Sequence, residues 1–374
     1  MPRTTRPRTT RPRTAADRGR SKRLQLDLAL QGGGSHGAFT WGVLDRLLQE
    51  EWLEIAAISG TSAGAMNAVA VASGLMQGGR EGARANLHRF WQRVAELSPF
   101  HHIQSGPLGS LATPLAGPVS AWLSPWTEPW QQALNAWGSQ FSPYQLNPLN
   151  LNPLRQILLD TVDFESVGRC DKTRLFIAAT QVRTGSLKVF EQCNLTPDMV
   201  LASACLPLLF QAVEIDGEDY WDGGYAGNPS LMPLIIQSPA NDLLLVQINP
   251  IERDERPTSA SDILDRISEV TFNASLLKEM RSIALLQQMI ADEGRPGHHY
   301  RNPLFQRVAA LRVHQIDGGA SLAPLGPTSK SNTQWAFLQQ LHALGRASAE
   351  QWLAAHAQDL GQRSSWDLHQ VLAP

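Results

Sequence analysis

A serine between two glycines is the first feature of the sequence that could do chemistry. The pentapeptide "GTSAG" places Ser62 between Gly60 and Gly64. Small residues on both sides of a serine permit the sharp strand-to-helix turn that exposes a nucleophilic Oγ. The pattern is short and also occurs in ordinary turns. The position of the pentapeptide strengthens this interpretation, because a short apolar run precedes it and a helical pattern follows it. The amino terminus of that helix would favour negative charge beside the serine.

A glycine-rich turn upstream could supply the hydrogen-bond donors that such a nucleophile needs. The segment "GGGSHG" contains Gly32, Gly33 and Gly34 at the end of an apolar run. Neighbouring parallel strands end at the same edge of a sheet, so these amides can lie beside Ser62 and donate to an oxyanion. A phosphate-binding loop is the alternative, but the segment matches neither the dinucleotide pattern nor the P-loop pattern.

A carboxylate follows in a third turn. The run "VEIDGEDYWDGGYAGNP" predicts two short strands joined at Asp216-Gly217, with Asp222 presented in a second glycine turn. Many Asp-Gly-Gly turns exist for conformational reasons alone. Asp222 is therefore a candidate base only in combination with the other two segments.

The periodicity of apolar residues gives the elements that must position these turns. Strands are expected at 24–30, 54–59, 174–182, 188–192 and 242–249, and helices at 37–50, 65–76, 262–293 and 331–357. The alternation predicts an α/β fold with a mostly parallel sheet covered on both faces. Residues 56–76 carry no charge over the length of a membrane span, but their Ala, Gly and Ser content favours a strand, a turn and a buried helix.

Together the three turns resemble those of the patatin-like phospholipase family, over about residues 24–250. "GGGSHG" is similar to the family's oxyanion loop, "GTSAG" to its nucleophile elbow, "DGG" to its Asp-Gly-Gly turn, and "ASACLP" to its Ala-Ser-x-x-x-P stretch. The resemblance implies a three-layer α/β/α fold and an acyl hydrolase that cleaves lipid or phospholipid esters without a metal or cofactor. It also implies a catalytic dyad of Ser62 as nucleophile and Asp222 as base.

The same resemblance assigns further residues. The amides of Gly32, Gly33 and Gly34 would form the oxyanion hole, with Gly33 and Gly34 favoured. His36 stands where the family usually has Arg or Lys. It is a candidate oxyanion or substrate contact, and it would carry a positive charge only when protonated.

Two other functions fit parts of the sequence. An α/β-hydrolase esterase with a Ser-His-Asp triad would share the elbow and would take its base from a histidine downstream of Asp222. The candidates are His298, His299, His314, His342, His356 and His369. A non-catalytic lipid-binding protein on the same fold is the second alternative, and three intact catalytic segments argue against it.

The amino-terminal segment differs from the rest of the chain. Residues 1–23 carry nine Lys or Arg against Asp17 alone, so residues 24–374 sum to −10. With a PRTTR repeat and almost no large apolar residue, this tail should be disordered and is not a secretory signal. A passive solubilising tail is the first interpretation; an arm that contacts anionic lipid is the alternative, with nucleic acid the less favoured partner.

Cysteine usage bears on the compartment. The three cysteines form no CxxC pair, which indicates neither a disulfide framework nor a zinc site. The sequence therefore favours a cytoplasmic, reducing compartment, with peripheral membrane contact through the basic tail and through residues 97–150.

Residues 24–374 are expected to form one acyl hydrolase domain with a cap-like insertion at about 97–150. The insertion contains eight prolines and a single formal charge, Glu128, so it should lie against something apolar. Four tryptophans lie in it: Trp122, Trp126, Trp130 and Trp137. We expect a cap that lines the acyl pocket and dips its tryptophans into a lipid interface; core packing or an oligomer interface is the alternative.

Replacing Trp126 and Trp130 with Ala tests the cap. Activity on long-chain or vesicle substrates should fall far more than activity on a short soluble ester, since only the former use the acyl pocket and the interface. Both activities are measured on the same preparation. Equal loss on the two substrates, or loss of folding, would assign the tryptophans to the core.

Overall fold

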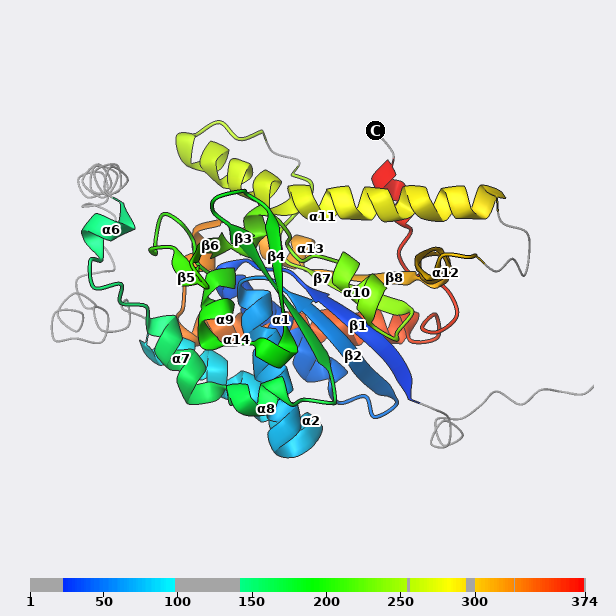
Figure 1. Ribbon diagram of the computed structural model, residues 1–374, viewed down its shortest axis with the longest axis horizontal. Helices are drawn as coiled ribbons and strands as arrows, with labels where there is room; N and C mark the ends of the chain where they lie inside the picture. Colours follow the sequence, from blue (N-terminus) through cyan, green and yellow to red (C-terminus); the bar gives the residue numbers. More distant parts are fainter. Residues whose placement is uncertain (1–22, 98–141, 254–255, 294–299, 326, 373–374) are drawn as a thin grey trace, which may run out of the picture.

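A mostly parallel sheet runs through the centre of the computed structural model, which describes residues 23–97, 142–253, 256–293, 300–325 and 327–372 (Figure 1). The strands are β1 (Leu24–Leu30), β2 (Leu53–Gly60), β3 (Arg174–Gln181), β4 (Leu187–Glu191), β5 (Val213–Ile215), β6 (Glu218–Asp222), β7 (Asp242–Gln247) and β8 (Arg312–Asp317). Their order is β5-β6-β3-β2-β1-β7-β8, and β4 also pairs with β3. Pairing is parallel from β3 across to β8, and β4, β5 and β6 add antiparallel pairs at one edge.

Helices cover both faces of this sheet (Figure 1). The α-helices are α1 (Gly37–Leu47), α2 (Ala63–Leu97), α6 (Pro143–Leu146), α7 (Pro153–Thr161), α8 (Phe164–Gly168), α9 (Pro197–Ser203), α10 (Met232–Gln237), α11 (Ala260–Glu293), α12 (Pro303–Ala310), α13 (Gly319–Leu322) and α14 (Trp335–His356). The 3-10 turns are η2 (Gly34–His36), η3 (Gln192–Asn194), η4 (Gly223–Tyr225), η5 (Ala323–Leu325), η6 (Pro327–Ser331) and η7 (Leu368–Leu372).

Two apolar cores lie between the sheet and the helices that cover it. The larger core joins one face of the sheet to α1, α2, α7, α8, α9 and α14, and the smaller joins the other face to α10, α11, α12 and η7. Strand β1 contributes to both, because Leu26, Leu28 and Leu30 point into the first core and Ala29 points into the second. The architecture is the expected three-layer α/β/α fold.

The predicted strands and the four predicted helices are present, but the shorter helices α7, α8, α9, α10, α12 and α13 were not predicted, and two further elements differ. Helix α2 continues to Leu97 through a kink at Gly78 and Gly79, whereas the sequence predicted an end near residue 76. Strand β8 was not predicted, because its polar residues do not form an apolar run. His314 of this strand is nevertheless fully buried. Its burial is tolerated because both ring nitrogens have polar partners, Ser365 and Asp242.

The uncharged stretch at 56–76 divides between β2, the turn that follows it and α2. Within the described part of the chain, no helix is long and apolar enough to cross a membrane.

Most of the insertion and the basic tail fall outside the described residues, including all four tryptophans named above. The described end of the insertion contains α6, which attaches to the chain just before β5. The Ala212 amide donates to the Tyr144 hydroxyl at 3.2 Å, and Gln211 Nε2 donates to the Asn147 carbonyl at 2.7 Å. The insertion therefore rejoins the domain close to the hairpin that carries Asp222.

One buried carboxylate joins three helices of the larger layer. Asp45 of α1 accepts from Arg84 Nε of α2 at 2.7 Å, forms an ion pair with Arg346 of α14, and lies 3.3 Å from His342 Nε2. Burial alone would raise the pKa of Asp45, but His342 and the two guanidinium groups outweigh it and hold that pKa well below its usual range. The ionised carboxylate is thus part of what holds α14 on the domain.

Replacing Asp45 with Asn should destabilise the fold at neutral pH by about 2–4 kcal/mol, because two guanidinium groups lose their charged partner. A carboxyl with a lowered folded pKa contributes stability above its unfolded pKa and loses it as the pH falls. The difference from wild type should therefore shrink below about pH 4. Urea unfolding at pH 7 and pH 2.5 measures it, because most of the contribution is lost only well below pH 4.

The matched control is Asp171→Asn, an exposed carboxylate beside Lys172, for which little change is expected at either pH. An Asp45→Asn difference that is the same at both pH values would contradict the role of the charge.

Candidate active site

The turn after β2 is strained at the serine. Ser62 has φ of 54°, in the left-handed region that a residue with a side chain rarely adopts. The turn is also tightly packed, since a Cβ on Gly64 would lie 2.2 Å from the Leu30 carbonyl oxygen. The Ser62 amide donates to Ser203 Oγ at 2.9 Å, and the residue remains half-buried at the carboxyl edge of the sheet. This is the geometry of a nucleophile elbow.

The glycine-rich turn lies directly against that serine. A Cβ on Gly32 would come within 2.7 Å of Ser62 Cβ, so no larger residue fits there. Both backbone groups of Gly32 are held by side chains. Its amide donates to Asn228 Oδ1 at 2.7 Å, and its carbonyl accepts from Asn249 Nδ2 at 2.7 Å.

These bonds change the expected set of oxyanion donors. The amide of Gly32 is occupied by Asn228, so Gly32 acts as the anchor of the turn rather than as a free donor. Among the described residues nothing accepts a hydrogen bond from the amides of Gly33 or Gly34. Gly33 is half-buried, and Gly34 is exposed. They are the donors that the turn can offer to a ligand.

Asp222 is completely buried at the end of β6. The hairpin that presents it turns at Asp216 and Gly217, with φ of 52° and 78°, as the Asp-Gly pair predicted. Its Oδ1 accepts from the Gly224 amide at 2.7 Å, whereas its Oδ2 has no hydrogen-bond partner within the described ranges.

Burial raises the pKa of Asp222 to about 7, against the opposing effects of the Gly224 amide and the Ser62 hydroxyl. The Ser62 hydroxyl is one of the groups that lower this pKa, although no hydrogen bond joins Ser62 to Asp222 among the described contacts. A buried carboxylate oxygen that has no partner among the described residues is available to accept a proton.

Three side-chain hydrogen bonds fix the turns relative to one another. Ser59 Oγ donates to the Ser230 carbonyl at 2.6 Å, and Thr61 Oγ1 donates to the Gly227 carbonyl at 2.7 Å. Thr180 Oγ1 of β3 donates to the Asp222 carbonyl at 2.8 Å. The elbow and the aspartate turn are therefore held as one unit.

His36 packs against the segment that follows α13. Its ring is buried, with Nε2 2.7 Å from Ser329 Oγ. Burial and the nearby Lys330 charge lower the pKa of His36 to about 4. A lowered pKa favours the neutral ring at physiological pH, and a contact of His36 with the oxyanion or the substrate stays a prediction.

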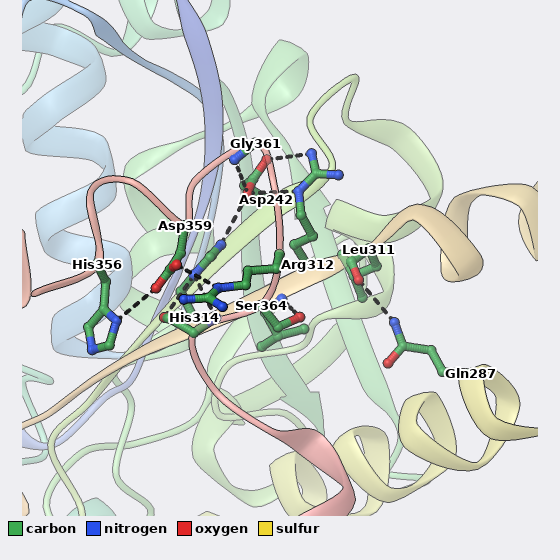
Figure 2. Close-up of polar contacts among 12 residues, drawn as sticks. Asp242, Gln287, Leu311, Arg312, His314, His356, Asp359, Gly361 and Ser364 are labelled. Carbon is green, nitrogen blue, oxygen red and sulfur yellow. Dashed lines mark hydrogen bonds and ion pairs between the residues drawn. The ribbon is translucent and has the colours of Figure 1, made fainter. Parts of the chain in front are cut away.

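The alternative of a histidine base is not supported by the described histidines. His314 contacts Asp242, which also binds Arg312 and the Gly361 amide, in a cluster at the amino-terminal ends of β7 and β8 (Figure 2). Ser62 lies at the opposite, carboxyl edge of the sheet. His342 lies 3.3 Å from Asp45, and His356 lies 3.0 Å from Asp359 (Figure 2). His298 and His299 lie outside the described residues, as does the side chain of His369.

Sequence reasoning missed the asparagines that hold the oxyanion turn. Asn228 and Asn249 each precede a proline directly after a glycine turn or a strand. Asn-Pro pairs are common at turns and also occur elsewhere in this chain, for instance at Asn152. The signal was therefore present but not specific. No group of His, Cys, Asp and Glu in the described part of the chain could hold a metal ion.

The fold and the serine turn define an α/β/α protein with a strained serine at the carboxyl edge of its sheet. The family model for patatin-like phospholipases matches residues 28–235. The chain belongs to the patatin-like phospholipase family, and it is a lipid acyl hydrolase.

Two solved structures are distant matches. VipD from Legionella pneumophila aligns with 14% identity and a TM-score of 0.40, covering 90% of this chain and 68% of VipD. ExoU of the Pseudomonas aeruginosa type III secretion system, crystallised with SpcU, aligns with 14% identity and a TM-score of 0.25, covering 91% of this chain and 80% of that one. No curated protein sequence matches the chain significantly.

The raised pKa of Asp222 predicts the pH dependence of the reaction. A general base works only when deprotonated, so kcat/KM on a short soluble ester should rise with pH and level off above about 7. An aspartate with an ordinary pKa would give a profile that is already flat from about pH 5. Initial rates between pH 4.5 and pH 9 distinguish the two, and a flat profile would contradict the buried base.

Proposed function

We propose that this protein hydrolyses lipid carboxylic esters through a catalytic dyad of Ser62 and Asp222, with the amides of Gly33 and Gly34 as the oxyanion hole. The observation that carries the proposal is a fully buried Asp222 whose Oδ2 has no partner among the described residues and whose pKa is influenced by the hydroxyl of the strained Ser62. A carboxylate with a raised pKa is the better base for an alcohol, and its burial supplies that shift.

The reaction proceeds in two acyl-transfer steps. Ser62 Oγ attacks the ester carbonyl while Asp222 takes its proton, and the amides of Gly33 and Gly34 hold the negative charge that forms on the carbonyl oxygen. The protonated Asp222 then gives its proton to the departing alcohol. Water attacks the acyl-enzyme with Asp222 again as base, which frees the fatty acid and restores the serine. Negative charge moves from a buried carboxylate to an oxygen held by amides.

Lipid contact at the same edge of the domain is part of this proposal. The Asp222 amide donates to the Cys205 carbonyl at 2.8 Å, so the turn that follows Cys205 begins beside the base. That turn presents Leu208 and Leu209 with exposed fractions of 84% and 60%. Exposed leucines beside a site for lipid esters suit contact with an aggregated substrate.

Replacing Ser62 with Ala or Asp222 with Asn should each reduce ester hydrolysis by at least about 10³-fold, because the two residues act as one unit. Both changes are close to isosteric, and circular dichroism should stay native. A fluorophosphonate should label wild type on Ser62 and leave Ser62→Ala unlabelled.

Two variants serve as matched controls. Ser186→Ala lies on the exposed turn between β3 and β4, and Asp219→Asn lies on the exposed part of the hairpin that carries Asp222. Both should keep wild-type activity. Substantial turnover by Asp222→Asn, together with its loss in a downstream histidine variant, would replace the dyad with a triad.

A further inference from the structure

A segment far outside the family match packs on the oxyanion turn. The 3-10 turn η6 begins 92 residues after the match ends at 235. His36 Nε2 lies 2.7 Å from Ser329 Oγ, and a Cβ on Gly34 would lie 2.4 Å from the Lys330 carbonyl oxygen. The conformation of the glycine turn therefore depends on η6 as well as on the elbow.

The Lys330 side chain reaches the same turn from inside the domain. Its Nζ donates to Asn249 Oδ1 at 2.7 Å, and Asn249 Nδ2 in turn donates to the Gly32 carbonyl at 2.7 Å. A Cβ on Gly33 would lie 3.4 Å from the same Asn249 Oδ1. The ammonium group is thus separated from the oxyanion turn by a single amide side chain.

This contact also orients the asparagine. With Oδ1 held by a cation, the Asn249 amide must direct its Nδ2 donor at Gly32. The other side of Gly32 is held by Asn228. Lys330 therefore fixes one of the two side chains that clamp the anchor of the turn.

The positive charge of Lys330 acts electrostatically on His36, which directly follows the glycine turn. Burial lowers the pKa of Lys330, which its interaction with Glu269 opposes. Glu269 is itself paired with Arg253 and Arg266, at 2.6 Å and 3.3 Å. Lys330 has no ion pair of its own within the described ranges, and its positive potential reaches His36. Negative charge that forms nearby would be stabilised by the same potential.

We propose that Lys330 is a positioning residue of the active site, which holds the oxyanion turn through Asn249 and adds positive potential where the carbonyl oxygen becomes negative. The inference rests on the proposed function, because it assigns the glycine turn to the oxyanion. The inference assigns η6 a role in the active site in addition to its packing on the domain. Its contribution belongs to the transition state, since a neutral ester carbonyl has little charge to stabilise.

The test compares three substitutions of Lys330 on a short, uncharged soluble ester. Lys330→Met removes both the charge and the donor and should lower kcat by about 10- to 100-fold with KM within about twofold of wild type. Lys330→Gln keeps a donor without the charge and should also lose activity, whereas Lys330→Arg keeps both and should recover most of it. Lys278→Met, at an exposed lysine of α11, is the control and should behave as wild type.

Two further readouts separate positioning from a purely structural effect. A trifluoromethyl ketone forms an oxyanion adduct with an active-site serine, so its affinity should fall in Lys330→Met by about the same factor as kcat/KM. The pKa of His36, followed by NMR, should rise in that variant because the nearby positive charge is gone. Lys330→Met with wild-type kcat, or with an unchanged ketone affinity, would overturn the inference.

The outcome is distinguishable from failure of the proposed function. If fluorophosphonate does not label Ser62 in wild type, the dyad itself is wrong. If Ser62 is labelled and Lys330→Met hydrolyses the ester normally, only the role of Lys330 is wrong. Should Lys330→Met fail to fold, the Arg and Gln variants decide, and equal activity in these two would overturn the role of the charge.

Discussion

Parallel pairing of β1 with β2 is the constraint on which the site depends. The register sets Leu30 opposite Gly60, so both strands deliver their following turns to the same edge at the same height. The glycine turn and the serine turn then meet so closely that Gly32 and Ser62 leave no room for a further carbon atom. The side chains of Asn228 and Asn249 hydrogen-bond to Gly32 and hold it in this contact.

The buried carboxylate is the second determinant, and it works against stability. With a folded pKa of about 7, Asp222 binds its proton more tightly in the folded than in the unfolded chain. Its contribution to folding is therefore complete below the unfolded pKa and is lost as the pH rises to about 7, a difference of about 4 kcal/mol. The hairpin, the Gly224 amide and the bond from Thr180 hold the turn in place despite this cost. In the dyad that we propose, the same burial gives the carboxylate the basicity that a serine nucleophile requires.

The carboxy-terminal part of the chain completes both the fold and the site. Strands β7 and β8 extend the sheet beyond β1, and α14 is held on α1 and α2 through Asp45. The loop after β7 supplies Asn249, and η6 supplies the contacts of Ser329 and Lys330. The family match ends at residue 235, yet the oxyanion turn is braced by residues well beyond it.

The sequence by itself determined the α/β/α class, most of the strands, the helices α1, α2, α11 and α14, and the three turns that carry Ser62, Asp222 and the glycines. These follow from local rules, since apolar periodicity, a G-x-S-x-G turn and an Asp-Gly hairpin each act over a few residues. Strand β8 was not predicted from the sequence, because its burial depends on partners such as Asp242, which is more than 60 residues away along the chain. Only the tertiary structure decided which glycine amides lack an acceptor among the described residues, that burial lowers the pKa of His36, and that Asn228, Asn249 and Lys330 surround the turn. Hydrogen-bond partners and the electrostatic effects of burial arise from residues that are distant along the chain, and no local pattern records them.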